Sequence, residues 1–309
     1  MSDFLLKLPS FAKINWVLRV LGRRSDGLHE LRTIFQTVTL QDQLKFSSRD
    51  DGLIKLACQA QGIPLDESNL IHRAANALRQ RYAVKQGAFI HLEKHIPAQG
   101  GLGGGSSNAA IALLGLAYLW DIKTSKRELT EICAGLGADV PFFLTGGTAL
   151  GKGLGTEVWP LAEVTRDSLL IVTPNAAVST AEAYKALNAP ALTKADSDII
   201  LSISCAEAQI VDSLPSGLHN DFERVVLRSN REIERAREAL LDAGAAGALL
   251  SGSGSSVFGI FDKREEQERA AGLLKAETGW LVFPCRTLSR AEYWRALGPC
   301  AAPLRDADG

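Results

Sequence analysis

A dense run of glycine is the feature that most constrains this chain. Five of the six residues from Gly100 to Gly105 are glycine, inside the segment PAQGGLGGGSSNAA. Glycine has no Cβ, so its backbone can adopt positive φ angles and approach a ligand closely. AFIHLEKHIP before the run is typical of a strand, and SSNAAIALLGLAYLW after it is apolar nearly all round, as a buried helix is. The sequence therefore predicts a glycine loop between a strand and a buried helix.

This loop predicts a phosphate site, because the unpaired N–H groups and the dipole at a helix start attract anions. A flexible turn is the alternative, and the two serines that directly follow the glycines disfavour it. The predicted nucleotide-binding residues are contiguous: Pro97, Ala98, Gln99, Gly100, Gly101, Leu102, Gly103, Gly104, Gly105, Ser106 and Ser107.

Two familiar nucleotide motifs do not fit. The dinucleotide fingerprint GxGxxG needs a third glycine where Ser106 stands. GGTALGKG matches GxxxxGK from Gly146 to Lys152, but the next residue is Gly153, where a P-loop needs Ser or Thr to hold magnesium. The glycine loop is therefore predicted to be a phosphate cradle of another type.

Charge and cysteine usage exclude several classes of protein. Lys plus Arg is 34 and Asp plus Glu is 35, a net charge of -1, which argues against nucleic acid and anionic membrane surfaces as partners. The start MSDFLLKLPSF lacks the apolar stretch of a signal peptide. We therefore expect a cytoplasmic protein. Five scattered cysteines without a CxxC pair indicate neither disulfides nor a zinc site: Cys58, Cys133, Cys205, Cys285 and Cys300.

With 309 residues, the chain is longer than one hydrophobic core usually supports, so we expect two domains. The glycine-rich GGTALGKGLGT precedes a new strand, which places the predicted domains at 1–158 and 159–309.

Several elements are predicted from local patterns. LRTIFQTVTL and DQLKFSS read as two strands, residues 220–244 as one long charged helix, residues 189–198 as a polar connector, and the tail from 299 as frayed.

Three segments resemble the GHMP kinase superfamily: SFAKINWVLRV from Ser10 to Val20, the glycine loop, and GALLSGSGSSVFGIF from Gly247 to Phe261. More narrowly, AKIN with SDGLHEL, GADVPFF and HNDFE is similar to the branch that phosphorylates 4-diphosphocytidyl-2-C-methyl-D-erythritol in the non-mevalonate isoprenoid pathway. The resemblance implies an α+β fold of two domains with the active site in the cleft between them. Ser251 to Ser256 would pack against the glycine loop.

The resemblance also implies the activity, which is ATP-dependent phosphorylation of a hydroxyl of that substrate to give the 2-phosphate. Magnesium would be carried with ATP, without a dedicated metal site in the protein. Two alternatives stay open. A kinase of the homoserine or mevalonate type would lack the DG-x-H segment, and a non-catalytic nucleotide-binding regulator would be expected to lose Asp139 or Lys13.

Asp139 and Lys13 are the predicted catalytic residues. On position alone, Asp139 could equally cap the next turn, and Lys13 could be a solvated strand residue. The resemblance implies that Asp139 is the base and contacts the substrate, with Lys13 beside it to keep it ionised and to stabilise the developing alkoxide. Asn15 lies two residues on, on the same strand face, and is predicted to bind the methylerythritol or phosphate end.

The residues expected to contact the cytosine differ in part from those of related enzymes. His29 is implied to hydrogen-bond the cytosine edge, but Leu28 stands where relatives often have a Tyr that stacks on the base. Tyr184 in STAEAYKAL matches a second-domain aromatic, so we expect it to carry the remaining stacking. The alternative is that Tyr184 only covers the domain surface. Asn220 and Asp221 are predicted to support the site from behind.

His91, Glu93 and His95 share one face of a predicted strand. Such a set suggests a metal, but the polar face of a strand explains it equally well, and the related kinases have no metal there. No metal site is predicted.

Overall fold

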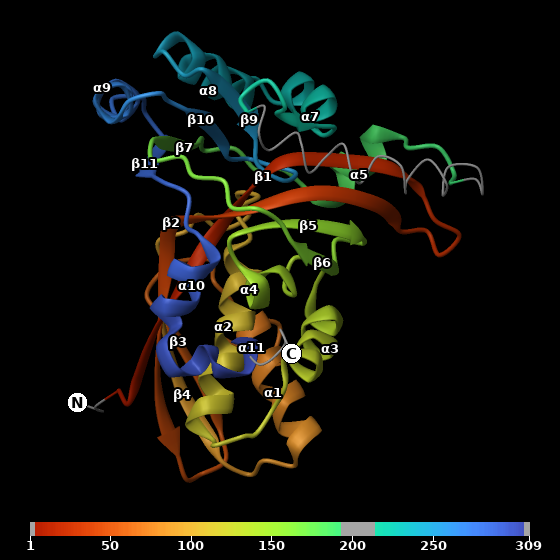
Figure 1. The fold of residues 1–309 in the computed structure, drawn as a ribbon, viewed down its shortest axis with the longest axis vertical. Helices are drawn as coiled ribbons and strands as arrows, with labels where there is room; N and C mark the ends of the chain where they lie inside the picture. Colours follow the sequence, from red (N-terminus) through yellow and green to blue (C-terminus); the bar gives the residue numbers. More distant parts are fainter. Residues whose placement is uncertain (1–3, 193–213, 306–309) are drawn as a thin grey trace.

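The computed structural model describes residues 4–192 and 214–305, and its strands form two sheets that lie one above the other in Figure 1. The larger sheet has seven strands in the order β3-β4-β2-β1-β8, with β5 beside β2 and β6 beside β5. The smaller sheet has the order β11-β7-β10-β9. Within these residues no helix is long and apolar enough to cross a membrane.

β1 (Leu6–Arg23) and β2 (His29–Arg49) are long antiparallel strands that form the centre of the larger sheet. The two strands predicted within residues 31–48 are in fact one, because β2 continues through both segments. Their pairing shifts register between Phe11 and Lys13 and again between Asn15 and Val17. Such irregularities re-aim side chains and are frequent beside active sites. Lys13 and Asn15 lie between these two shifts.

Helices cover one face of the larger sheet (Figure 1). The central helix α2 (Gly104–Leu119) is buried along nearly its whole length, as its apolar sequence predicts. Asn69 caps α1 through the backbone N–H of Ile71. The other elements of this half are β3 (Ile54–Cys58), β4 (Gly87–Glu93), β5 (Thr148–Gly153), β6 (Glu157–Pro160), β8 (His219–Asn220), α1 (Leu70–Tyr82), α3 (Lys126–Leu136) and α4 (Phe142–Thr145).

Lys152 of the GxxxxGK match lies inside β5, opposite Arg32 of β2. It is therefore a strand residue and does not stand in a loop before a helix, which agrees with rejecting a P-loop.

The smaller sheet is buried on both faces. Along β7 (Leu169–Thr173), Leu169 and Ile171 pack toward the larger sheet, whereas Leu170 and Val172 pack against helices on the other side. This alternation is what a strand between two apolar layers requires. The remaining elements of this half are β9 (Gly247–Leu250), β10 (Val257–Ile260), β11 (Leu281–Cys285), α5 (Thr180–Leu187), α7 (Glu223–Ser229), α8 (Arg231–Asp242) and α9 (Arg264–Leu274).

The long charged helix predicted for residues 220–244 is wrong, since α7 and α8 are separate helices. The break is at Asn230, whose φ of -140° and ψ of 98° are extended. Asn has a low helix propensity because its side chain competes for backbone hydrogen bonds. Of the polar connector predicted at 189–198, residues 189–192 are irregular apart from a β-bridge between Ala191 and Arg23. Its remaining residues, like Cys205, lie outside the described ones.

The end of the chain returns to the larger sheet through α10 (Arg290–Leu297), a 3-10 turn (Gly298–Ala301) and α11 (Ala302–Arg305). The predicted fraying from residue 299 is therefore wrong up to Arg305, because Cys300 and Leu304 are buried in the core beneath α2. Residues 306–309 lie outside the described part. The domain boundary at 158 stays a prediction, and β6 spans that position in the larger sheet.

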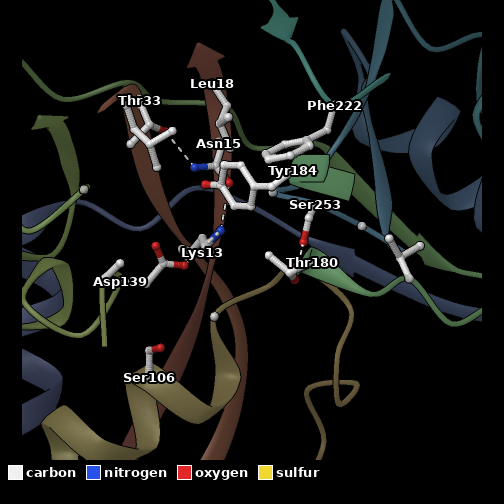
Figure 2. A pocket seen from close by; sticks show the side chains of 18 of the residues that line it. Lys13, Asn15, Leu18, Thr33, Ser106, Asp139, Thr180, Tyr184, Phe222 and Ser253 are labelled. Atoms are coloured by element: carbon white, nitrogen blue, oxygen red, sulfur yellow. Dashed lines mark hydrogen bonds and ion pairs between the residues drawn. The ribbon is translucent and has the colours of Figure 1, made fainter. Parts of the chain in front are cut away.

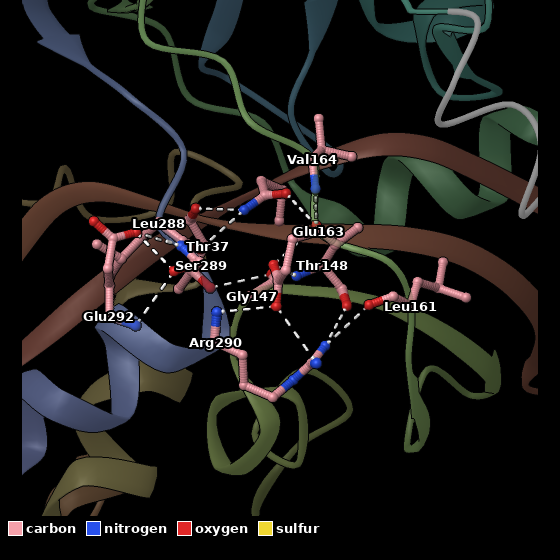
Figure 3. A network of polar contacts seen from close by, with 11 residues as sticks. Thr37, Gly147, Thr148, Leu161, Glu163, Val164, Leu288, Ser289, Arg290 and Glu292 are labelled. Carbon is pink, nitrogen blue, oxygen red and sulfur yellow. Dashed lines mark hydrogen bonds and ion pairs between the residues drawn. The ribbon is translucent and has the colours of Figure 1, made fainter.

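The segment that leaves β6 for β7 and the one that returns from β11 to α10 are held side by side by a polar network (Figure 3). The Glu163 carboxylate accepts the backbone N–H of Arg290 at 3.0 Å and that of Thr148 at 3.2 Å. The Arg290 guanidinium donates to the Thr148 carbonyl at 2.8 Å. The outgoing segment at Glu163 and the returning segment at Arg290 are thereby tied to β5.

Candidate active site

The glycine loop has the left-handed backbone that its composition predicts. Gly101 has a φ of 74° and Gly103 a φ of 67°, and Gly103 is the N-cap of α2. No side chain caps that helix. The N–H groups of its first turn therefore remain available to a bound anion.

The loop separates two cavities. The larger, of about 770 Å³, lies between the two sheets, and the smaller, of about 360 Å³, lies between the loop and the start of α1. Gln99, Gly101, Gly103 and Ser106 line both of them. The loop is therefore a common wall through which ligands in the two cavities can meet.

Lys13 and Asp139 meet in the larger cavity (Figure 2). Lys13 Nζ lies 3.4 Å from Asp139 Oδ2, with the Lys13 side chain 3% and the Asp139 side chain 34% exposed. The backbone N–H of Lys13 donates to the Leu102 carbonyl at 2.9 Å, which joins β1 to the glycine loop. The structure thus brings the two predicted catalytic residues together beside the predicted phosphate cradle.

Asp139 stands in the turn between α3 and α4. A cap for α4 was the alternative, but the N-cap residue there is Pro141 and no side chain makes a capping hydrogen bond. The carboxylate instead borders the cavity opposite Lys13. A partly exposed carboxylate next to a buried ammonium is suited to accept a proton from a bound hydroxyl.

Asn15 shares the strand face of Lys13, as predicted. Lys13 Nζ donates to Asn15 Oδ1 at 2.8 Å, and Asn15 Nδ2 donates to Thr33 Oγ1 at 2.7 Å. Thr33, on β2, also lines the larger cavity and was not predicted. Only the β1–β2 pairing, which places Thr33 opposite Leu18, brings it to this site.

The two serines at the start of α2 differ in environment. Ser107 is buried, and its Oγ lies 2.7 Å from Ser10 Oγ. Ser106 is half-buried and lines both cavities. The Ser106 hydroxyl is therefore the one placed to reach a ligand, while the ligand contacts of Ser107 and of the other loop residues stay a prediction.

The second glycine-rich segment packs against the first, which confirms that expectation. Ser251 Oγ donates to the Gly101 carbonyl at 3.1 Å, and the Ser256 N–H donates to the Gly100 carbonyl at 3.1 Å. A Cβ added at Gly101 would stand 2.0 Å from the Ser251 carbonyl oxygen, so glycine is required for this approach.

Asn220 and Asp221 support this arrangement from behind. Asn220 Nδ2 donates to the Leu250 and Gly252 carbonyls at 2.8 Å each, which fixes the second glycine segment. Asp221 Oδ2 accepts the Val20 N–H of β1 at 2.7 Å. These contacts join the β8 region of the larger sheet to the second glycine segment and to β1.

His29 and Tyr184 stack on one another, with ring centroids 4.6 Å apart and planes at 23°. Phe222 meets Tyr184 edge to face at 4.9 Å. Tyr184 and Phe222 line the larger cavity, and Leu28 is 50% exposed. Burial, and then the charge of Arg23, lower the pKa of His29, whereas burial and the nearby Asp139 raise the pKa of Tyr184.

This chain is similar to known proteins over nearly its whole length. The GHMP kinases N terminal domain matches residues 69–147, and the GHMP kinases C terminal domain matches residues 207–277. The 4-diphosphocytidyl-2-C-methyl-D-erythritol kinases of Syntrophus aciditrophicus and Geobacter metallireducens are each 39% identical to it. They cover 92% and 93% of this chain, respectively, and 100% of their own length. The chain belongs to this kinase family.

Solved structures agree with that family. A crystal structure of 4-(cytidine 5'-diphospho)-2C-methyl-D-erythritol kinase is 31% identical, covers 92% of this chain and 100% of its own, and has a TM-score of 0.74. A homoserine kinase from Cytophaga hutchinsonii, 18% identical with a TM-score of 0.68 over 94% of this chain and 96% of its own, shares the fold. The protein therefore has the two-domain GHMP kinase fold, with the larger cavity in the cleft between its sheets.

Two further features of this family member were missed in the sequence. Thr180 Oγ1 and Ser253 Oγ lie 2.8 Å apart at the cavity wall, one at the start of α5 and one in the second glycine segment. Lys94 lines the smaller cavity, and its Nζ lies 2.7 Å from the buried Asp42. These pairs join distant segments, so no local pattern could reveal them.

His91 and Glu93 lie on one face of β4, whereas His95, predicted on the same strand, lies beyond its end at Glu93. Glu93 forms an ion pair with Lys45, and His91 Nε2 lies 4.0 Å from Glu93 Oε1. His95 is exposed. Among residues 4–192 and 214–305, no group of three or more His, Cys, Asp or Glu side chains is arranged to hold a metal.

Proposed function

We propose that this kinase transfers the γ-phosphoryl group of ATP to a hydroxyl of 4-diphosphocytidyl-2-C-methyl-D-erythritol, giving the 2-phosphate for isoprenoid precursor synthesis. The observation that carries the proposal is the Lys13–Asp139 pair, with Nζ and Oδ2 3.4 Å apart, in a cavity that shares its glycine wall with a second cavity. One cavity is then available for each substrate.

ATP occupies the smaller cavity in this proposal, with its phosphates crossing the glycine loop toward Lys13. The uncapped N–H groups at the start of α2 face the phosphates and stabilise their negative charge. Positive φ at Gly101 and Gly103 lets the backbone take this path.

The acceptor hydroxyl lies beside Asp139, which takes its proton as the oxygen attacks the γ-phosphorus. Lys13 stabilises the negative charge that develops on the acceptor oxygen and on the transferred group. Because Lys13 is nearly buried, its charge is screened less by water than that of a surface lysine.

Magnesium fits the site as an ion carried by the ATP phosphates, with the Ser106 hydroxyl as the side chain placed to contact it. The Ser107 hydroxyl, hydrogen-bonded to Ser10, is less available. When bound, the ion neutralises phosphate charge.

The cytidine end of the acceptor is placed against Tyr184, with His29 beside it and Asn15 toward the methylerythritol or phosphate end. Tyr184 lines the cavity and offers a flat apolar surface for a base. We also propose a cytoplasmic location, in keeping with the free thiols of Cys58, Cys133, Cys285 and Cys300.

The test is ADP release with each of four alcohols: the cytidine substrate, homoserine, mevalonate and galactose. Turnover with the cytidine substrate alone, with a new phosphomonoester seen by phosphorus NMR, is the expected result. Turnover only with one of the other three would reassign the chain to another GHMP kinase activity. ATP binding without any turnover would indicate a nucleotide-binding regulator.

A further inference from the structure

A chain of three buried hydrogen bonds leads away from Lys13, and Figure 2 shows the first two, from Lys13 to Asn15 and from Asn15 to Thr33. Lys13 Nζ donates to Asn15 Oδ1 at 2.8 Å, Asn15 Nδ2 donates to Thr33 Oγ1 at 2.7 Å, and Thr33 Oγ1 donates to the Val17 carbonyl at 2.8 Å. Lys13, Asn15 and Thr33 are 3%, 1% and 2% exposed. Water therefore cannot readily replace any of these bonds.

The direction of each bond follows from the number of protons available. The Thr33 hydroxyl has one proton, which is given to the Val17 carbonyl. Its oxygen can then only accept from Asn15, so the amide nitrogen of Asn15 faces Thr33 and the amide oxygen faces Lys13. The reversed amide would place an NH₂ group against the ammonium, so that two donors would face each other.

The contact with Asn15 also sets the distance between Lys13 and Asp139. Lys13 has a flexible four-carbon stem, and a free ammonium would close onto the nearest carboxylate. Here Nζ is 2.8 Å from Asn15 Oδ1 but 3.4 Å from Asp139 Oδ2. The Asp139 carboxylate is thereby left open to accept a proton from the substrate hydroxyl.

We propose that Thr33 is a positioning residue of this kinase. It orients the Asn15 amide, and Asn15 in turn holds the Lys13 ammonium beside Asp139 without closing the ion pair. The proposal rests on the proposed function, because it assigns Thr33 an effect on phosphoryl transfer through Lys13 and Asp139.

Thr33→Val removes the hydroxyl and keeps the shape of the side chain. We expect kcat with the cytidine substrate to fall about tenfold to a hundredfold, because small misplacements of catalytic groups have effects of this size, while the KM for ATP changes little. Thr33→Ser keeps the hydroxyl and should restore most of kcat. Thr37→Val is the matched control on the same strand: it loses a buried hydroxyl that bonds the Gly147 carbonyl and should leave kcat unchanged.

A double-mutant cycle separates positioning from a general loss of packing. In an Asn15→Ala background, adding Thr33→Val should lower kcat no further, since Thr33 acts through Asn15. A further tenfold loss there, or a Thr33→Val enzyme with wild-type kcat, would overturn the proposal. If Thr33→Val does not fold, kcat of Thr33→Ala is measured instead and judged by the same criteria. A wild-type enzyme without activity on the cytidine substrate would instead refute the proposed function.

Discussion

The two ends of the larger cavity are built in different ways. At one end, Lys13 is 3% exposed and held by its own backbone bond to Leu102 and by Asn15. At the other end, Tyr184 lines the cavity and stacks at 4.6 Å on the ring of His29, which follows the half-exposed Leu28 in the chain. Main-chain bonds and a buried amide hold the first end, whereas stacking between a side chain of β2 and one of α5 forms the second.

In the proposed function, the first end carries out proton transfer and the second end recognises the base. Groups that transfer a proton must be placed within fractions of an ångström, which buried, hydrogen-bonded side chains provide. A flat base tolerates variation in the surface that covers it, because stacking depends on area more than on exact geometry. In the proposed function, that tolerance is consistent with Leu28 at the position where the resemblance implies an aromatic ring.

The largest expected effect is at the catalytic end. Asp139→Asn keeps the shape but removes the proton acceptor, so kcat should fall about 10²- to 10⁴-fold while ATP still binds. Steady-state kinetics and calorimetric ATP titration measure both quantities. Asp121→Asn, which changes a side chain that is 88% exposed, is the control and should be neutral. Near-normal turnover of Asp139→Asn would remove Asp139 from the chemistry.

The next effect tests the aromatic end. Tyr184→Ala removes the ring, and base stacking is worth about 1–3 kcal/mol, so the KM for the cytidine substrate should rise about tenfold to a hundredfold. The KM for ATP should change little, because Tyr184 does not line the smaller cavity. Tyr184→Phe keeps the ring and is the control. Equal rises in both KM values would show a loss of fold rather than of stacking.

A smaller effect concerns the wall between the cavities. Gly105 lies in the first turn of α2, and an added Cβ would find only Leu70 Cδ1, at 3.9 Å. Gly105→Ala should raise the KM for ATP about tenfold, because the methyl group enters the nucleotide cavity. It should also raise Tm, because Ala stabilises a helix by up to about 1 kcal/mol over Gly.

Gly135→Ala in α3 is the matched control for this prediction, since nothing lies within 4 Å of a Cβ at that position. It should raise Tm in the same way and leave ATP binding unchanged. An unchanged KM for ATP in Gly105→Ala would move the nucleotide away from this wall.

The smallest effect is a pH dependence at the aromatic end. The pKa of His29 is lowered in the folded protein by burial and then by Arg23, so the neutral ring stabilises the fold. Its contribution is present above the ordinary pKa of about 6.5 and is lost as the pH falls through the lowered value. Between about pH 7.5 and pH 5.5, Tm of the wild type should fall slightly more than Tm of His29→Phe, which keeps a ring but does not titrate. Identical pH profiles would contradict this role.

Local patterns predicted the glycine loop and the buried helix after it, because each depends on residues within one or two turns. They failed where tertiary contacts override propensity. β2 stays continuous because it pairs with β1, β4 and β5, and the tail to Arg305 is ordered because Cys300 and Leu304 are buried. The strand face shared by Lys13 and Asn15 was predictable, but Thr33 was not, because it reaches them from another strand.

The sequence by itself determined the family and the local features of the site: the glycine loop, a lysine and an aspartate in apolar surroundings, and a histidine after a turn. These depend on residue type and on short-range backbone preferences. Only the tertiary structure decided which groups meet. It set Lys13 at 3.4 Å from Asp139, turned the Asn15 amide toward Lys13 and stacked His29 on Tyr184. The physical reason is that such contacts join segments far apart in the chain, and only the packing of the two sheets brings these segments together.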